Sequence, residues 1–215
     1  MNKLLKNTML LVPLFAATSC GPQAPKEDPY AKYKPTEAEW AANIERIKTG
    51  KISANLQLNW GEGEKETINL EATATKVKQH YIATGSLPQI IVNENGSYFN
   101  YYQITLSKWG KEESSLEDFN EVKYNLLPMQ LVYSNFTWGG ETYKMTNVEP
   151  IVSAQEGETI TFTNVSVTIT PSTKQISLIE ANVTTVRGEE TTSGTMKIAY
   201  TYKPDTFDIE VPVVE

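Results

Sequence analysis

Long runs of this chain alternate apolar and polar residues, and this period of two constrains the fold more than any other feature. From Ile52 to Trp60 every second residue is apolar, and the residues between them are Ser, Asn or Gln. Successive side chains of a β-strand point to opposite faces, so the pattern predicts a strand with one buried and one solvated face. Sheets with one solvated face are typically antiparallel. We therefore expect an antiparallel sheet.

Further runs extend this sheet along the chain. The turn at 61–64 leads into alternating runs between Ile68 and Ala83. Two more runs, at 88–92 and 97–106, flank Asn95-Gly96. Asn and Gly both tolerate positive φ, which favours a tight hairpin at this dipeptide. The first half of the chain thus predicts a series of antiparallel strands joined by short turns.

Two later runs change their apolar phase. Within 159–170 the apolar positions shift by one residue near Thr163-Asn164, and a matching shift lies between Leu178 and Ile179. A shift of one residue moves all later side chains to the other face unless a bulge compensates for it. Two facing shifts predict a bend that strongly curves the sheet. Runs at 196–202 and 207–211 predict two last strands.

Two segments carry helix signals instead. Thr36-x-x-Glu39 is a capping box followed by apolar residues at helical spacing, so a helix is predicted over 36–48. In the middle of the chain Ser114-Ser115 can cap a second helical region over 116–136, with Pro128 in the first turn of another helix. We expect both regions to pack on the concave face of the sheet.

The N-terminus is expected to be a lipoprotein-type signal peptide over residues 1–19. Lys3 and Lys6 precede an apolar stretch that leads through small residues to Cys20, the only cysteine. This pattern predicts cleavage before Cys20 and acylation of its thiol. The acyl chains would anchor the protein in the cell envelope, on the extracytoplasmic face of a bacterial membrane. Ordinary cleavage after Ser19 is the alternative.

The remainder is expected to form a linker and one domain. Residues 20–35 contain four prolines among charged and small residues, a composition that favours a flexible, extended linker. Residues 36–215 suffice for a single domain with its own core. Without residues 1–19 the chain carries 17 Lys+Arg against 26 Asp+Glu, which disfavours nucleic acid as a partner. With Cys20 acylated, no disulfide can form.

The order of these elements resembles the LolA, LolB and LppX/LprG group of bacterial carrier proteins. The shared features are an early amphipathic helix, long antiparallel strands, an apolar helical insertion, a hairpin at Thr170–Thr173 and a closing strand at Asp205–Pro212. The resemblance implies an α+β fold: a strongly curved antiparallel β half-barrel, or unclosed barrel, with a few helices packed across its concave face. It also implies that lipids, acyl chains or lipoproteins bind between sheet and helices. It assigns no functional residue.

The residues expected between sheet and helices are apolar, and they either fill a core or line a ligand cavity. They are Leu56, Leu58, Trp60, Leu126, Leu127, Met129, Leu131, Val132, Tyr133 and Phe136. In the cavity alternative, residues 127–131 face residues 56–60 across a dry space of about 300 to 1,000 Å³. A cavity would make the protein a lipid-anchored carrier of an apolar ligand, whereas a filled core would make it a structural or interaction module of the envelope.

Signals for catalysis or a bound cofactor are weak. His80 lies in a predicted strand without a G-x-S-x-G elbow or the ligand spacing of a zinc site. An acidic cluster lacks the glycine-bearing loop of a calcium site and is interpreted as a solvated helix face. Its members are Glu112, Glu113, Glu117, Asp118 and Glu121. We expect no metal, no cofactor and no enzyme activity, a glycosidase with two carboxylates being the catalytic alternative. The expected partners are the membrane, an apolar ligand and an envelope protein.

Overall fold

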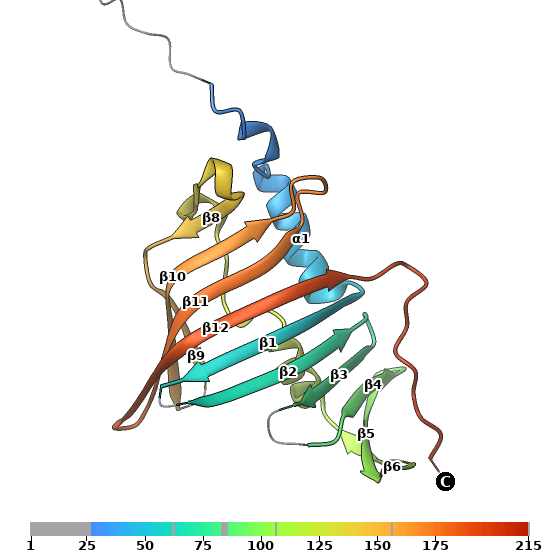
Figure 1. Cartoon of the computed structure of the whole chain (residues 1–215). Coiled ribbons are helices and arrows are strands. Elements are labelled where there is room, and N and C mark those ends of the chain that lie inside the picture. The colour runs from blue at the N-terminus through green and yellow to red at the C-terminus, as the bar shows by residue number, and fades with distance from the viewer. Residues whose placement is uncertain (1–26, 62, 83–85, 106, 156, 215) are drawn as a thin grey trace, which may run out of the picture.

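The computed structural model describes residues 27–61, 63–82, 86–105, 107–155 and 157–214 (Figure 1). In this part of the chain twelve strands form one antiparallel sheet with helices on one face, which confirms the α+β class and the antiparallel sheet. The signal peptide, Cys20 and the first part of the expected linker lie outside the described residues. No helix among the described residues is long and apolar enough to cross a bilayer.

The helical elements comprise two α-helices and three short 3-10 turns. They are η1 (Ala31–Tyr33), α1 (Glu37–Thr49), α2 (Leu116–Tyr124), η2 (Tyr133–Asn135) and η3 (Gly140–Thr142). The strands are β1 (Ile52–Trp60), β2 (Glu64–Ala72), β3 (Lys76–Tyr81), β4 (Gln89–Glu94), β5 (Ser97–Thr105), β6 (Lys108–Ser114), β7 (Thr137–Trp138), β8 (Lys144–Asn147), β9 (Ile151–Gln155), β10 (Glu158–Ile169), β11 (Ile176–Arg187) and β12 (Glu190–Tyr202).

The first and last strands meet in the middle of the sheet. The strand order is β6-β5-β4-β3-β2-β1-β12-β11-β10-β8-β7, with β9 paired to β10 beside this path. Ile52 lies opposite Tyr202 in the pairing of β1 with β12, and Trp60 lies opposite Gly194. The two end strands of this order, β6 and β7, are not paired with each other among the described strands, so the sheet is unclosed.

The predicted changes of phase in β10 and β11 are present. The register between these strands shifts near Asn164, whose φ is 53°. Asparagine adopts this left-handed conformation more readily than most residues, which suits the extra residue of a bulge. A second shift just before Ile169 allows Ile176 and Ile179 of β11 both to be buried. The two shifts therefore keep apolar residues buried on the inner face on both sides of each shift, from Phe162 to Ile169 in β10 and from Ile176 to Val183 in β11.

Both helices begin with the capping boxes that the sequence predicts. Thr36 Oγ1 accepts a hydrogen bond from Glu39 N at 3.2 Å, and Glu39 Oε2 accepts one from Thr36 N at 2.7 Å. Ser115 and Asp118 form the equivalent box at the start of α2. The buried apolar residues of both helices belong to the main hydrophobic core, which lies against one face of the sheet, hereafter the inner face.

The apolar stretch after α2 is irregular rather than helical, which corrects the helix predicted from Pro128 and the helical region predicted to end at 136. Residues 126–129 are all buried, whereas a helix lying on a sheet buries only one stripe. Side chains of the core also bind the carbonyl groups of this segment, since Trp40 Nε1 donates a hydrogen bond to Leu131 O at 3.0 Å. Burial on all sides thus favours an irregular backbone.

Strand β6 lies where the sequence predicts none. Its residues are almost all polar on both faces, so the alternation that marks the other strands is missing. As an edge strand, β6 has a partner on one side only, β5, and needs little apolar surface. Glu112 and Glu113 therefore lie on a strand, which corrects their assignment to a helix face.

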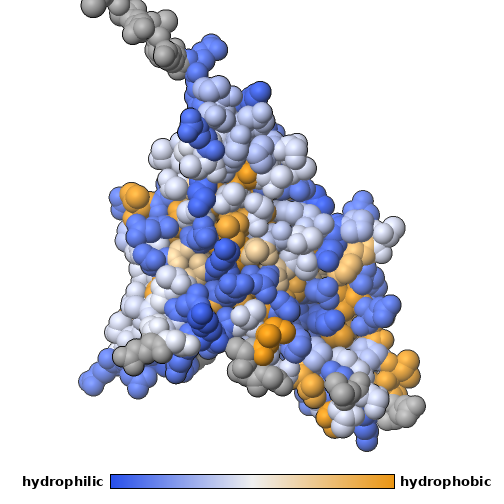
Figure 2. Space-filling view, viewed as in Figure 1, coloured by the Kyte–Doolittle hydropathy of each residue, from blue (hydrophilic) through white to orange (hydrophobic). Residues whose placement is uncertain are grey.

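The C-terminal segment 207–211 is not the predicted closing strand. It has no strand partner and runs from the end of β12 down past β3 to β6 (Figure 1). Ile209 packs with Ile90, Val92 and Tyr101 in a second, smaller core on the other face of the sheet, hereafter the outer face. An ion pair between Lys76 Nζ and Asp208 Oδ2 at 2.6 Å fixes the segment to β3. Figure 2 shows the outer face, with polar residues over much of it and apolar residues gathered toward the β4–β6 end.

The described end of the expected linker is folded onto the domain. Residues Ala31–Tyr33 form η1, and the rings of Tyr30 and Tyr33 lie edge-on to Tyr143 with centroid distances of 5.8 and 5.4 Å. Tyr133 Oη also donates a hydrogen bond to Pro35 O at 2.8 Å. The ordered contacts of the domain thus begin before residue 36.

Candidate functional site

The apolar residues predicted to line a cavity lie in or against the main hydrophobic core. The buried members are Leu56, Leu126, Leu127, Met129, Leu131 and Phe136. Leu58, Trp60 and Tyr133 are partly buried against the same core, and Val132 is 43% exposed. Neither of the two pockets described below is lined by both residues 127–131 and residues 56–60. Most of these residues therefore pack as core.

Part of the insertion also borders an open hollow of about 600 Å³, hereafter the apolar groove, between the C-terminal ends of α1 and α2 and strand β9. Its apolar lining is Leu127, Pro128, Met129, Val152 and Ala154. Lys48 and Lys123 add two ammonium groups to the lining, and burial lowers the pKa of Lys123 below its ordinary value. The apolar groove thus combines carbon-rich surface with positive charge.

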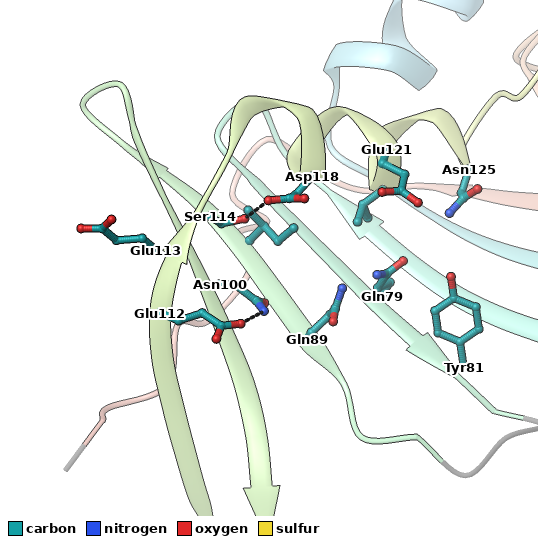
Figure 3. Close-up of a pocket in the computed structure, with 12 residues that line it drawn as sticks. Gln79, Tyr81, Gln89, Asn100, Glu112, Glu113, Ser114, Asp118, Glu121 and Asn125 are labelled. Atoms are coloured by element: carbon teal, nitrogen blue, oxygen red, sulfur yellow. Dashed lines mark hydrogen bonds between the residues drawn. The ribbon is translucent and has the colours of Figure 1, made fainter. Parts of the chain in front are cut away.

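A more enclosed hollow of about 340 Å³, hereafter the polar pocket, lies between α2 and strands β3 to β6 (Figure 3). Its principal polar residues are Gln79, Gln89, Asn100 and Glu112 from the sheet and Asp118 and Glu121 from α2. Ile91 and Val122 are the aliphatic residues of its lining. This volume is within the range of about 300 to 1,000 Å³ that is usual for small-molecule sites.

Strand pairing places the amide side chains of the polar pocket on the inner face. Gln79 of β3 lies opposite Gln89 of β4, and Asn100 of β5 lies opposite both Ile91 of β4 and Glu112 of β6. Ile91 belongs to the main core, so the polar pocket continues the inner face from the core toward the β6 edge. Figure 3 shows the side chains of Gln79, Gln89 and Asn100 on the face of these strands that α2 covers.

Two side-chain oxygen atoms in this pocket are buried without a hydrogen-bond donor. Gln79 is 8% exposed, and its Oε1 receives no hydrogen bond from the described residues. Asn100 donates from Nδ2 to Glu112 Oε1 at 2.9 Å, while Asn100 Oδ1 receives no hydrogen bond from the described residues. Burying an acceptor without a donor costs about 1–3 kcal/mol. Both oxygens are therefore suited to accept hydrogen bonds from a bound molecule.

The carboxylates around the polar pocket make it acidic. Hydrogen bonds from Ser115 and Ser114 to Asp118, at 2.8 to 2.9 Å from their hydroxyl groups, lower the pKa of the Asp118 carboxyl. Burial, with a smaller contribution from the charge of Glu121, raises the pKa of the Tyr81 phenol. The described lining contains no lysine or arginine to neutralise these carboxylates. The pocket therefore disfavours anions and favours neutral or cationic molecules that donate hydrogen bonds.

The sequence analysis missed this pocket, although the alternation of the strands contains a signal for it. Gln79 and Asn100 occupy inward positions, where one neighbouring strand carries an apolar residue, Leu70 of β2 opposite Gln79 and Ile91 of β4 opposite Asn100. His80 points to the outer face, in the next position of β3 and opposite Asn69, so it contributes nothing to the pocket. Among the described residues, no three His, Cys, Asp or Glu side chains come together to hold a metal ion.

Comparisons with known proteins assign no family to the chain. No family model matches it, and no curated protein matches it. A solved structure of PNGF-II in the C2 space group aligns with 12% sequence identity and a TM-score of 0.32. The alignment covers 74% of this chain and 28% of that chain. A likeness at this level carries no argument about fold or function.

Proposed function

We propose that this chain is a lipid-anchored protein of the bacterial cell envelope that binds a small polar ligand in the polar pocket. The observation that supports ligand binding is the Gln79 side chain, which is 8% exposed yet has an Oε1 that receives no hydrogen bond from the described residues. Most buried polar groups in proteins are paired. A ligand that donates to Gln79 Oε1 and Asn100 Oδ1 would pair both oxygens and offset the cost of burying them.

The membrane anchor in this proposal rests on the N-terminal sequence. Lys3 and Lys6, the apolar stretch after them and the small residues before Cys20 support cleavage and acylation at that cysteine. Acyl chains on Cys20 would hold the domain at the membrane, since more than one chain anchors a protein stably. We also propose the LolA-type half-barrel as the finer description of the fold. The unclosed strand order and the register shifts in β10 support it.

A carrier of an apolar ligand is the second candidate, and the apolar groove is where it would act. Val152 is 61% exposed there, and Lys48 and Lys123 could pair with an anionic head group. The acyl chain would lie on the exposed surface of Val152 and Ala154, beside Leu127 and Met129, rather than in the closed cavity expected from the sequence. A structural or interaction module without any small ligand is the remaining alternative.

Binding by the full-length Cys20→Ser protein, which lacks the acylation site, separates these functions. We expect a panel of monosaccharides, amino acids and diamines to contain probes that raise the melting temperature of this protein. Gln79→Met keeps the length of the side chain and removes the acceptor, so it should abolish those shifts while leaving the melting temperature of the free protein equal or higher. The measurement is differential scanning fluorimetry, with Gln57→Met on the outer face as the matched control.

The result that would overturn the proposal is a panel without any binder. In that case, binding of the fluorescent fatty acid cis-parinaric acid identifies the carrier, provided that Val152→Asp in the apolar groove abolishes it and Gln79→Met does not. If neither the panel nor the fatty acid binds, the module without a ligand remains.

A further inference from the structure

The hydrogen-bonding groups of the polar pocket constrain the ligand beyond its size. The two buried atoms without a donor, Gln79 Oε1 and Asn100 Oδ1, are both acceptors. The amide nitrogen of Asn100 already donates to Glu112 Oε1. A ligand that places acceptor atoms here would leave these oxygens unpaired, so the atoms that contact them must be N–H or O–H donors.

The charges of the pocket then distinguish nitrogen donors from hydroxyl donors. Glu112 lies on the strand side of the pocket and Asp118 and Glu121 lie on α2, while the described lining has no lysine or arginine. A cation inside this ring of carboxylates is attracted, and hydrogen bonds to ionised partners are stronger than neutral ones. A neutral polyol would gain the hydrogen bonds without the attraction.

A metal ion is a poorer match than an organic cation. Among the described residues, no three carboxylate, imidazole or thiol side chains come close enough together to coordinate an ion. The volume of about 340 Å³ is also that of a molecule of several non-hydrogen atoms rather than of one ion. Ile91 and Val122 lie in the same lining and offer apolar surface to the carbon atoms of such a molecule.

We propose that the polar pocket binds a small organic amine whose N–H groups donate to Gln79 Oε1 and Asn100 Oδ1. Glu112 and Glu121 supply the compensating negative charge from opposite sides of the pocket, and Ile91 and Val122 contact the carbon chain. This inference rests on the proposed function, because it assigns a chemical class to the ligand of the same pocket.

Isothermal titration calorimetry with two matched probes tests the inference on the full-length Cys20→Ser protein. Putrescine and 1,4-butanediol have the same carbon chain and differ in their terminal groups. We expect putrescine to bind at least about 10-fold more tightly than the diol, and its affinity to fall as salt concentration rises.

Variants that remove a single charge test whether putrescine binds in the polar pocket. Glu121→Gln should weaken putrescine binding about 5- to 10-fold without affecting the fold, since Glu121 is exposed on α2. Glu117→Gln on the same helix lies outside the pocket and should change the affinity less than about 2-fold. Gln79→Met should abolish binding, and its melting temperature shows whether the variant is folded.

Two results would overturn the inference. If the diol binds as tightly as putrescine and Gln79→Met abolishes binding of both, the pocket binds a neutral hydrogen-bond donor. The amine inference is then wrong, and the proposed function is still supported. If neither probe binds and no other member of the polar panel binds, the amine inference and the polar-ligand function fail together.

Discussion

The two halves of the inner sheet face are built from similar strands, yet one half is a solid core and the other encloses a polar pocket. In the half formed by β1 and β10 to β12, inward residues such as Leu56, Val167 and Ile198 are at most 3% exposed. In the half formed by β3 to β6, the inward positions include Gln79 and Asn100. The same backbone architecture therefore supports either packing or binding, depending on which side chains point inward.

The segments that pack on the two halves of the inner face also differ in polarity. Residues 126–129, which belong to the insertion, are buried without exception and contribute to the main core. Helix α2, which covers the other half, buries Phe119 and Val122 but carries Asp118 and Glu121 toward the pocket. An apolar segment packed on apolar strands leaves no space between them. An acidic helix face packed on strands with amide side chains leaves a space that a polar molecule can occupy.

The largest effect should come from the core half, through Trp40→Ala. Trp40 is 2% exposed, packs against Tyr133 and Phe136 with ring centroids at 5.9 and 5.1 Å, and donates to Leu131 O. Its removal leaves a cavity and an unpaired carbonyl group, so the free energy of unfolding should fall by about 3–5 kcal/mol. Urea unfolding measures the change. A loss below about 1 kcal/mol would show that the insertion is not held by this contact.

The stability of the pocket half should depend on the small core of the outer face, and Ile209→Ala tests this dependence. Ile209 is 3% exposed in the small core that covers Ile90 and Val92. The substitution should lower the free energy of unfolding by about 2 kcal/mol, at the low end for a buried isoleucine because this core is small. Hydrogen exchange should accelerate in β4 and β5 and not in β11. Val213→Ala, at a position that is 87% exposed, is the matched control and should change neither quantity.

The smallest effect should come from Ser115→Ala at the start of α2, the cover of the pocket half. The Ser115 hydroxyl donates to Asp118 Oδ2 at 2.8 Å and accepts from Asp118 N at 3.0 Å, and its hydrogen bond is the largest cause of the lowered pKa of Asp118. Loss of the cap should cost about 1 kcal/mol near pH 7.

The pH dependence of this variant has a defined sign. A pKa that is lower in the folded state than in the unfolded state adds stability above the ordinary value of 3.8, and this stability is lost as the pH falls through the folded pKa. The difference in free energy of unfolding between wild type and Ser115→Ala should therefore become smaller as the pH falls. An NMR titration should show a higher pKa for Asp118 in the variant, and an unchanged pKa would contradict the assignment of the hydrogen bond.

The sequence predicts the core half well because there the apolar period and the buried face coincide. The alternation in β1 and the shift near Asn164 are both visible in the apolar residues, and capping boxes identify the helix starts at Thr36 and Ser115. The run at 126–131 has no period, because it is buried on several sides, and its irregular backbone cannot be distinguished from a helix by pattern alone.

The pocket half is harder to predict because its apolar pattern and its structure do not coincide. Edge strand β6 lacks alternation, and the segment around Ile209 alternates although its contacts come from side chains rather than from a strand partner. Polar residues at inward positions, such as Gln79, look like ordinary strand residues until the pairing with β4 shows which face they occupy. The pocket depends on that pairing and on the position of α2, which are tertiary properties.

The pairing of β1 with β12 also determines when the sheet can be completed during synthesis. Ile52 and Tyr202 are paired although they lie 150 positions apart in the chain. At about 5–20 residues per second, β1 is synthesised roughly 7 to 30 s before its central neighbour, β12, is complete. Throughout that interval the nascent chain can build β2 to β6 but carries β1 as an unpaired edge with an apolar side. Such an edge is prone to pair with another chain, so rapid completion of the C-terminal strands protects this protein from self-association before it is folded.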